Sequence, residues 1–204
     1  MLERYENAIQ IATLAVCVTV SLFRAAKYRS RSWTLLSFFY GSWLLGDIYW
    51  LNCLLFYGET PHISVVSDLS WYAALIFLYM LLRKISPPEE LRDASPVSWL
   101  GPAFTIGMAV FFMIRGEIIS NLIYAGLMGL LLFAAIRRLI PEDRTEQSCL
   151  PAMILIYCLL EYSLWTSSCF WNDAALFQPY YIFDLLLTMC FPFLIPAIGK
   201  AVTT

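Results

Sequence analysis

Histidine and charged residues are scarce in this sequence of 204 residues. It contains one histidine, His62, and only 14% of its residues are charged, against about a quarter in soluble domains. A single histidine cannot build a multi-histidine zinc site, and it cannot supply a serine–histidine–aspartate triad inside a bilayer. No block of lysine and arginine is present, so we expect no nucleic-acid partner.

Two other kinds of site, a retinal Schiff base and a cysteine metal site, also lack the residues that they need. No lysine lies in the middle of the last apolar run, which excludes a retinal Schiff base there. The six cysteines have no metal-ligand spacing, and we expect most of them to be small buried residues. Cys53 and Cys169 are predicted at similar depths and could meet, but unpaired thiols are favoured.

Apolar residues, in contrast, make up 60% of the chain, and the mean hydropathy is +0.69. They fall into seven runs, each close to the 20 or so residues that cross a bilayer, at roughly 8–23, 33–56, 63–82, 99–114, 118–136, 150–170 and 180–198. In lipid the backbone must satisfy its own hydrogen bonds, which favours helices. The sequence therefore predicts an all-α membrane protein, a seven-transmembrane helix bundle forming one domain over 1–204. The fourth run is the weakest, because Gly101, Pro102 and Gly107 interrupt it.

Basic residues indicate how this bundle is oriented. The connections after runs one, three and five, together with Lys200, hold 11 of the 13 lysines and arginines, and the other side keeps only Arg4 and Arg115. Cytoplasmic connections carry the excess of lysine and arginine. We therefore expect a multi-pass protein of the cell membrane with its N-terminus outside and its C-terminus in the cytoplasm.

Two halves of the chain share a pattern of acids and tryptophans. Asp47 and Asp68 lie 21 residues apart on runs two and three, and Glu161 and Asp184 lie 23 apart on runs six and seven. This spacing predicts a parallel 3+1+3 internal repeat, with repeats at 8–84 and 117–200 and a connector helix at 98–114. The arrangement resembles the plan of small sugar and vitamin facilitators, although their Pro-Gln turns and Trp/Asn motifs are absent. The alternative is coincidence among helices of similar composition.

The same four acids are the candidates for chemistry. An ionisable group at membrane depth costs about 2.5–3.5 kcal/mol or more, so it usually faces the interior of the bundle and serves a function. The helical rise places all four between the midplane and the outer surface. We expect them to converge on one cavity that opens to the outer side.

Aromatic neighbours suggest what such a cavity binds. Tryptophans or tyrosines lie one helical turn from each acid, and carboxylates beside aromatic faces suit a cation, while rings and hydroxyls also suit a sugar or polyol. Tyr72 has a second interpretation as a membrane-interface residue. No lysine or arginine lies within the runs, so the deep acids Asp47 and Glu161 should be protonated, bonded to each other or neutralised by a cation. The predicted ligand-binding residues are Asp47, Trp50, Asp68, Trp71, Tyr72, Glu161, Trp165 and Asp184.

Three functions fit these features. The first is a transporter or facilitator for a small molecule or cation. The second is a receptor-like sensory or accessory subunit with a cytoplasmic or membrane protein partner, and the third is a membrane enzyme that acts on lipid head groups through carboxyl acid–base pairs. The sequence indicates no catalytic residues and no cofactor-binding residues, and it leaves both the cofactor and a metal site undecided.

Overall fold

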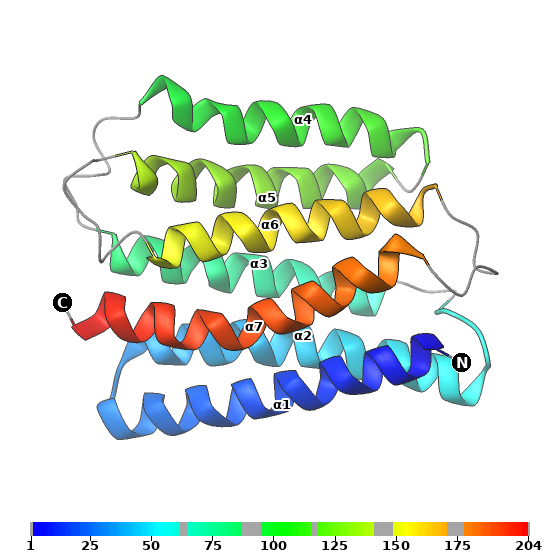
Figure 1. Ribbon diagram of the computed structural model, residues 1–204, viewed down its shortest axis with the longest axis horizontal. Helices are drawn as coiled ribbons and strands as arrows, with labels where there is room; N and C mark the ends of the chain where they lie inside the picture. Colours follow the sequence, from blue (N-terminus) through cyan, green and yellow to red (C-terminus); the bar gives the residue numbers. More distant parts are fainter. Residues whose placement is uncertain are drawn as a thin grey trace.

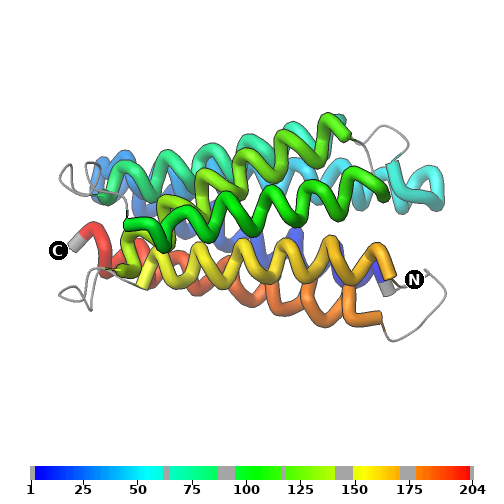
Figure 2. The backbone as a smooth tube through the Cα atoms, turned by 90° about the horizontal axis from the view of Figure 1, so that it is seen from above, coloured from blue at the N-terminus to red at the C-terminus, as the bar shows by residue number. Residues whose placement is uncertain are grey.

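The computed structural model describes residues 2–61, 65–86, 95–115, 118–140, 149–170 and 178–203; His62 and the predicted repeat boundary at 117 lie outside them. These ranges contain no strand and form seven helices that run roughly along one axis (Figures 1 and 2). They are α1 (Leu2–Tyr28), α2 (Arg31–Phe56), α3 (Val65–Ile85), α4 (Leu100–Met113), α5 (Ile118–Leu139), α6 (Cys149–Ser168) and α7 (Pro179–Thr203). A short 3₁₀ helix, η2 (Pro96–Trp99), leads directly into α4.

Six of these helices are long and apolar enough to cross a membrane, which confirms a multi-span helical membrane protein. The weakly predicted fourth run is among them, because η2 extends α4 to an 18-residue segment, Pro96–Met113. The helix outside this group is α2. It has 26 residues, but its serines, tyrosines, tryptophans and Asp47 lower its hydropathy. Many of these side chains are buried among neighbouring helices.

Helix α1 begins earlier than predicted, at Leu2 instead of about residue 8. Glu3 lies in its first turn, where a carboxylate interacts favourably with the helix dipole. The buried residues Gln10, Leu14 and Cys17 repeat at helical spacing along one face. Extending this face by two turns brings Glu3 onto the inner side of the bundle, so a segment predicted to precede the membrane joins the first helix.

Six helices form a closed ring, and the seventh lies outside it. Around the ring the neighbours are α1, α2, α3, α5, α6 and α7, and α7 packs back against α1. Helix α4 packs against α5 and forms one edge of the molecule (Figure 1). A rotation that carried α1–α3 onto α5–α7 would keep this order of neighbours. The order is therefore compatible with the internal repeat, which stays a prediction.

The basic residues of the helices gather at one end of the bundle. Helices α1, α3, α5 and α7 run in the same direction, and each carries lysine or arginine in its last turn, whereas α2 and α6 carry none there. The C-terminus lies at this basic end and the N-terminus at the opposite end (Figure 1). The asymmetry of lysine and arginine in the sequence thus corresponds to a basic end of the folded bundle.

Large aromatic side chains fill the core between α2, α6 and α7. Phe39, Tyr40, Tyr157 and Phe191 are almost completely buried, and the rings of Phe39 and Tyr157 meet edge to face at 5.8 Å. The Tyr40 hydroxyl donates a hydrogen bond of 2.6 Å to the carbonyl oxygen of Phe191. This aromatic cluster separates the two ends of the bundle on the side of α7.

Candidate functional site

A cavity of about 460 Å³ lies inside the ring, toward the end that holds the N-terminus. The second halves of α2 and α6 line it together with the first halves of α1, α3, α5 and α7, and it reaches the connecting residues Thr60 and Gln178. All eight residues predicted from the sequence line this one cavity. Their role in binding a ligand stays a prediction, but the structure does bring them together.

Asp47 is only 2% exposed, and Trp71 of α3 holds it. The Trp71 indole N–H donates to Asp47 Oδ1 at 3.4 Å. Asp47 Oδ2 is buried, and no donor in the described part of the chain bonds it. A Cβ atom at Gly46 would lie 2.7 Å from Trp71 Nε1, so glycine is needed for this ring to lie against α2.

Glu161 is 1% exposed and has two donors on one oxygen. The Tyr124 hydroxyl donates to Glu161 Oε2 at 2.9 Å, and the Trp165 indole N–H donates to the same atom at 3.2 Å. The second oxygen, Oε1, is buried without a donor among the described residues. Glu161 and Asp47 therefore share one arrangement, in which neutral donors hold one carboxyl oxygen and the other remains unsatisfied.

Asp184, which is 6% exposed, faces α1. The Gln10 side-chain amide donates to Asp184 Oδ1 at 3.2 Å. The Glu6 carboxyl also lies within hydrogen-bonding reach of Asp184. Both Glu6 oxygens are buried, and none of the described donors bonds them. Two carboxylates at this distance repel each other, so the pair needs a proton or a cation between its oxygens.

Asp68 and Tyr72 lie on the α3 wall of the cavity. Asp68 is half-buried and also lines a second hollow of about 320 Å³ that contains Arg115 and shares several tryptophans with the main cavity. The Tyr72 hydroxyl bonds both the side chain and the carbonyl oxygen of Ser120 on α5, the latter at 3.3 Å. Tyr72 therefore makes its polar contact inside the bundle.

Four tryptophans form a continuous aromatic wall. Trp71 lies at its centre, with ring centroids 5.8 Å from Trp43, 5.8 Å from Trp50 and 6.2 Å from Trp165. Each indole N–H is used: Trp50 donates to Glu3 Oε1 at 3.4 Å, Trp43 donates to the Tyr157 hydroxyl at 3.1 Å, and the other two donate to Asp47 and Glu161. The four tryptophans thus line the cavity with their ring faces, and three of their N–H groups bond carboxyl groups.

These bonds differ from the pairs suggested by helical spacing. Glu161 does bond Trp165 of its own helix. Trp50 lies one turn from Asp47 on α2, yet its N–H donates to Glu3 on α1. Asp47 instead accepts from Trp71, which lies on α3 with Asp68. The tryptophans therefore link neighbouring helices, a connection that spacing along one helix cannot predict.

Several cavity residues were not predicted. Glu3, Asn7 and Gln10 line the cavity from α1, and their spacing of four and three residues leading to Leu14 is a helical stripe that could have revealed them. Tyr124 follows Ser120 and Asn121 by four and three residues on α5, and this shorter polar stripe could have revealed it in the same way. Its hydroxyl makes the shortest of the bonds to Glu161 described above.

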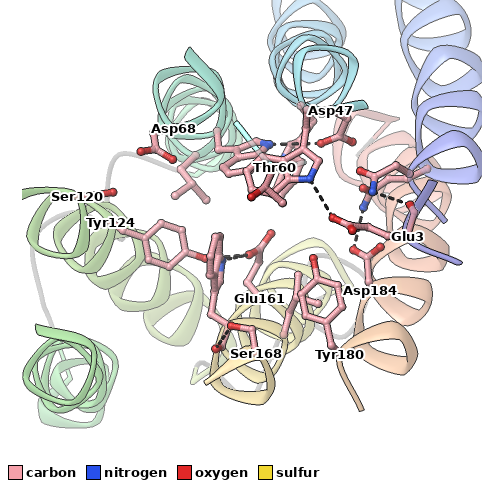
Figure 3. Close-up of a pocket in the computed structure, with 18 of the residues that line it drawn as sticks. Glu3, Asp47, Thr60, Asp68, Ser120, Tyr124, Glu161, Ser168, Tyr180 and Asp184 are labelled. Atoms are coloured by element: carbon pink, nitrogen blue, oxygen red, sulfur yellow. Dashed lines mark hydrogen bonds between the residues drawn. The ribbon is translucent and has the colours of Figure 1, made fainter. Parts of the chain in front are cut away.

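The acids surround the cavity on separate walls (Figure 3). Within the described ranges, no three histidine, cysteine, aspartate or glutamate residues come together in a way that could hold a metal ion. All six cysteines are unpaired, Cys53 and Cys169 included. The arrangement of the described acids therefore suits a ligand large enough to touch more than one wall.

Comparison with known proteins adds no relative: no family model, curated protein or solved structure matches the chain.

The contact between Gly46 and Trp71 gives a direct test of this geometry. We expect Gly46→Ala to displace the Trp71 ring and to lower stability by about 1–3 kcal/mol, as overpacking usually does. Gly41→Ala on the same helix is the matched control, because a Cβ atom there meets nothing within 4 Å. Thermal unfolding of the purified protein in detergent measures both. Equal stability of the two variants would contradict the placement of Trp71.

Proposed function

We propose that this protein is a small-solute transporter or facilitator that binds an organic cation in its acidic and aromatic cavity. One observation supports this most strongly. Five carboxyl groups and four tryptophans line a single cavity, and none of the described residues lining it is a lysine or arginine. The five acids are Glu3, Asp47, Asp68, Glu161 and Asp184.

The physical basis is charge complementarity in a medium of low dielectric constant. A positive charge entering the cavity gains attraction to several carboxyl groups, and this attraction is stronger inside the bundle than in water. Tryptophan faces add cation–π attraction, which becomes larger when the cation is desolvated. The volume of about 460 Å³ lies within the usual range for small-molecule sites. An organic cation of this size can touch acids on several walls.

The proposal also includes a topology: the chain crosses the membrane seven times and its N-terminus lies outside. Helix α2 packs against α1 and α3 along the same axis, so we assign it as the seventh span despite its lower hydropathy. The basic end of the bundle would then face the cytoplasm. The cavity would lie in the outer half and receive its ligand from outside.

Transport would require this cavity to open alternately to the two sides. The buried cluster of Phe39, Tyr40, Tyr157 and Phe191 lies on the inner side of the site and would have to part. Pro192 and Pro196 interrupt the backbone hydrogen bonds of α7 beside this cluster. A pair of three-helix units rocking about an axis along the membrane normal is a known transporter plan, and the ring order fits it.

A second candidate is a membrane enzyme that uses carboxyl acid–base pairs on a lipid head group. The observation that favours it is the pair formed by Asp184 and Glu6, since neighbouring buried carboxyl groups can act as acid and base. The receptor-like alternative, with a cytoplasmic or membrane protein partner at the basic end, rests on the sequence alone.

Ligand binding is testable with benzyltrimethylammonium, a permanently charged organic cation. We expect it to raise the thermal unfolding temperature of the purified protein, whereas neutral benzyl alcohol and sorbitol should not. Asp47→Asn should weaken binding about tenfold or more, because one tenfold step corresponds to about 1.4 kcal/mol. Glu59→Gln is the control, since Glu59 is exposed and lies outside the cavity. Stabilisation by sorbitol but not by the cation would instead indicate a polyol site.

Orientation is testable in cells. We expect a reporter that fluoresces only in the cytoplasm to be bright when it is fused after residue 204, because the basic last turns of α1, α3, α5 and α7 lie at the C-terminal end. Western blotting confirms expression of the fusion. A dark but fully expressed fusion would reverse the orientation.

A further inference from the structure

Four acids with buried carboxyl oxygens lie on α1, α2, α6 and α7, and two of them form a close pair. Glu6 and Asp184 lie within hydrogen-bonding reach of each other. Asp47 and Glu161 are both close enough to interact electrostatically with Asp184, and Asp47 also interacts with Glu161. Each of the four therefore affects the charge state of at least one other.

The groups that face this set are neutral or acidic. Its hydrogen-bond donors are the side chains of Gln10, Trp71, Tyr124 and Trp165. Other titratable groups of the described walls that line the cavity are Glu3 from α1, Asp68 and Tyr72 from α3, Tyr157 from α6, and Tyr180 and Tyr181 from α7. Cys158 and Tyr162 of α6 also interact electrostatically with Glu161. Among the described residues of these walls, no cationic side chain neutralises the acids.

Full ionisation of this set is therefore unfavourable. Two carboxylates at hydrogen-bonding distance repel each other more strongly in a medium of low dielectric constant than in water. Buried carboxylates also lose hydration, and one oxygen of Asp47 and of Glu161 has no donor among the described residues to replace it. Neighbouring carboxyl groups in this situation share protons and titrate as a unit. Glu6 and Asp184, whose carboxyl groups lie within hydrogen-bonding reach, are therefore placed to share a proton.

We propose that binding of an organic cation in the cavity releases a proton from Asp47, Glu161, Asp184 and Glu6, so that the protein exchanges an organic cation for protons. This inference rests on the cation-binding function proposed above. The bound cation supplies the positive charge that the protons had supplied, and one proton leaves for each charge that enters. When the cation leaves on the other side, a proton takes its place and the acids become neutral again.

This exchange explains two features that simple cation binding leaves open. Glu6 does not line the cavity, yet its carboxyl group is buried against Asp184, which does. A carboxyl group in that position can receive a proton from Asp184 without touching the ligand. The donors on Asp47 and Glu161 are neutral, so these two acids can exist in both protonation states without breaking an ion pair.

Proton release during binding is the decisive measurement. The purified full-length protein is placed in weakly buffered detergent solution at pH 7 with a pH-indicator dye, and benzyltrimethylammonium is added. This ion has no proton to lose, so any acidification comes from the protein. We expect about one proton released per bound cation. We also expect an affinity that rises up to tenfold per pH unit between pH 6 and pH 8, because binding and deprotonation are linked.

Glu6→Gln separates proton exchange from cation binding. The glutamine amide can donate to Asp184 and keep it ionised. We therefore expect this variant to retain cation binding, to release fewer protons and to show a flatter pH dependence. Glu59→Gln, outside the cavity, should behave like the unmodified protein.

The outcomes distinguish the two proposals. Cation binding with no proton release and an affinity independent of pH would overturn the exchange and leave the cation site intact. Absence of cation binding in the unmodified protein at every pH would overturn the proposed function, and the exchange with it. Both readouts use the unmodified protein, so they do not depend on the folding of any variant.

Discussion

The rest of this structure depends on one constraint: its buried carboxyl groups have no basic partner among the described residues that line the cavity. Lipid offers no donors to Asp47, Glu161 or Asp184, so the bundle must provide them itself. It does so with neutral groups, mainly indole N–H groups and a tyrosine hydroxyl. Acids held only by neutral donors can still be neutralised by a bound cation. An acid already paired with arginine has its charge compensated and attracts a further cation less.

The ring of six helices follows from the same constraint. Three of the cavity acids bond a residue of a neighbouring helix: Asp47 of α2 bonds α3, Glu161 of α6 bonds α5, and Asp184 of α7 bonds α1. These polar contacts connect adjacent members of the ring at one depth. Farther from the N-terminal end, the aromatic cluster around Phe39 and Phe191 joins α2 to α7. The bundle is therefore polar and hollow in one half and filled with aromatic rings in this part of the other.

The four acids could be predicted from the sequence, because an ionisable residue inside an apolar run costs free energy at any position in the bilayer. The sequence also places them in one half of the membrane, since helical rise converts sequence position into depth. Prediction from the sequence failed where partners come from other helices. Trp71 lies one turn from Asp68 on α3, but its N–H bonds Asp47 of α2. Glu3 was not predicted because hydropathy alone starts the first helix too late, and Tyr124 was not predicted because the polar face that it forms with Ser120 and Asn121 is only one turn long.

Asp47 and Glu161 should act together on one ligand, and a double-mutant cycle measures whether they do. Binding of benzyltrimethylammonium is measured by isothermal titration for the unmodified protein, Asp47→Asn, Glu161→Gln and the double variant. Residues that share a ligand should show a coupling energy of about 0.5 kcal/mol or more. We predict that the double variant loses less affinity than the sum of the single losses, because either change already removes part of a shared interaction. Losses that add within about 0.3 kcal/mol would mean that Asp47 and Glu161 act independently, and the account of a single cation site would be wrong.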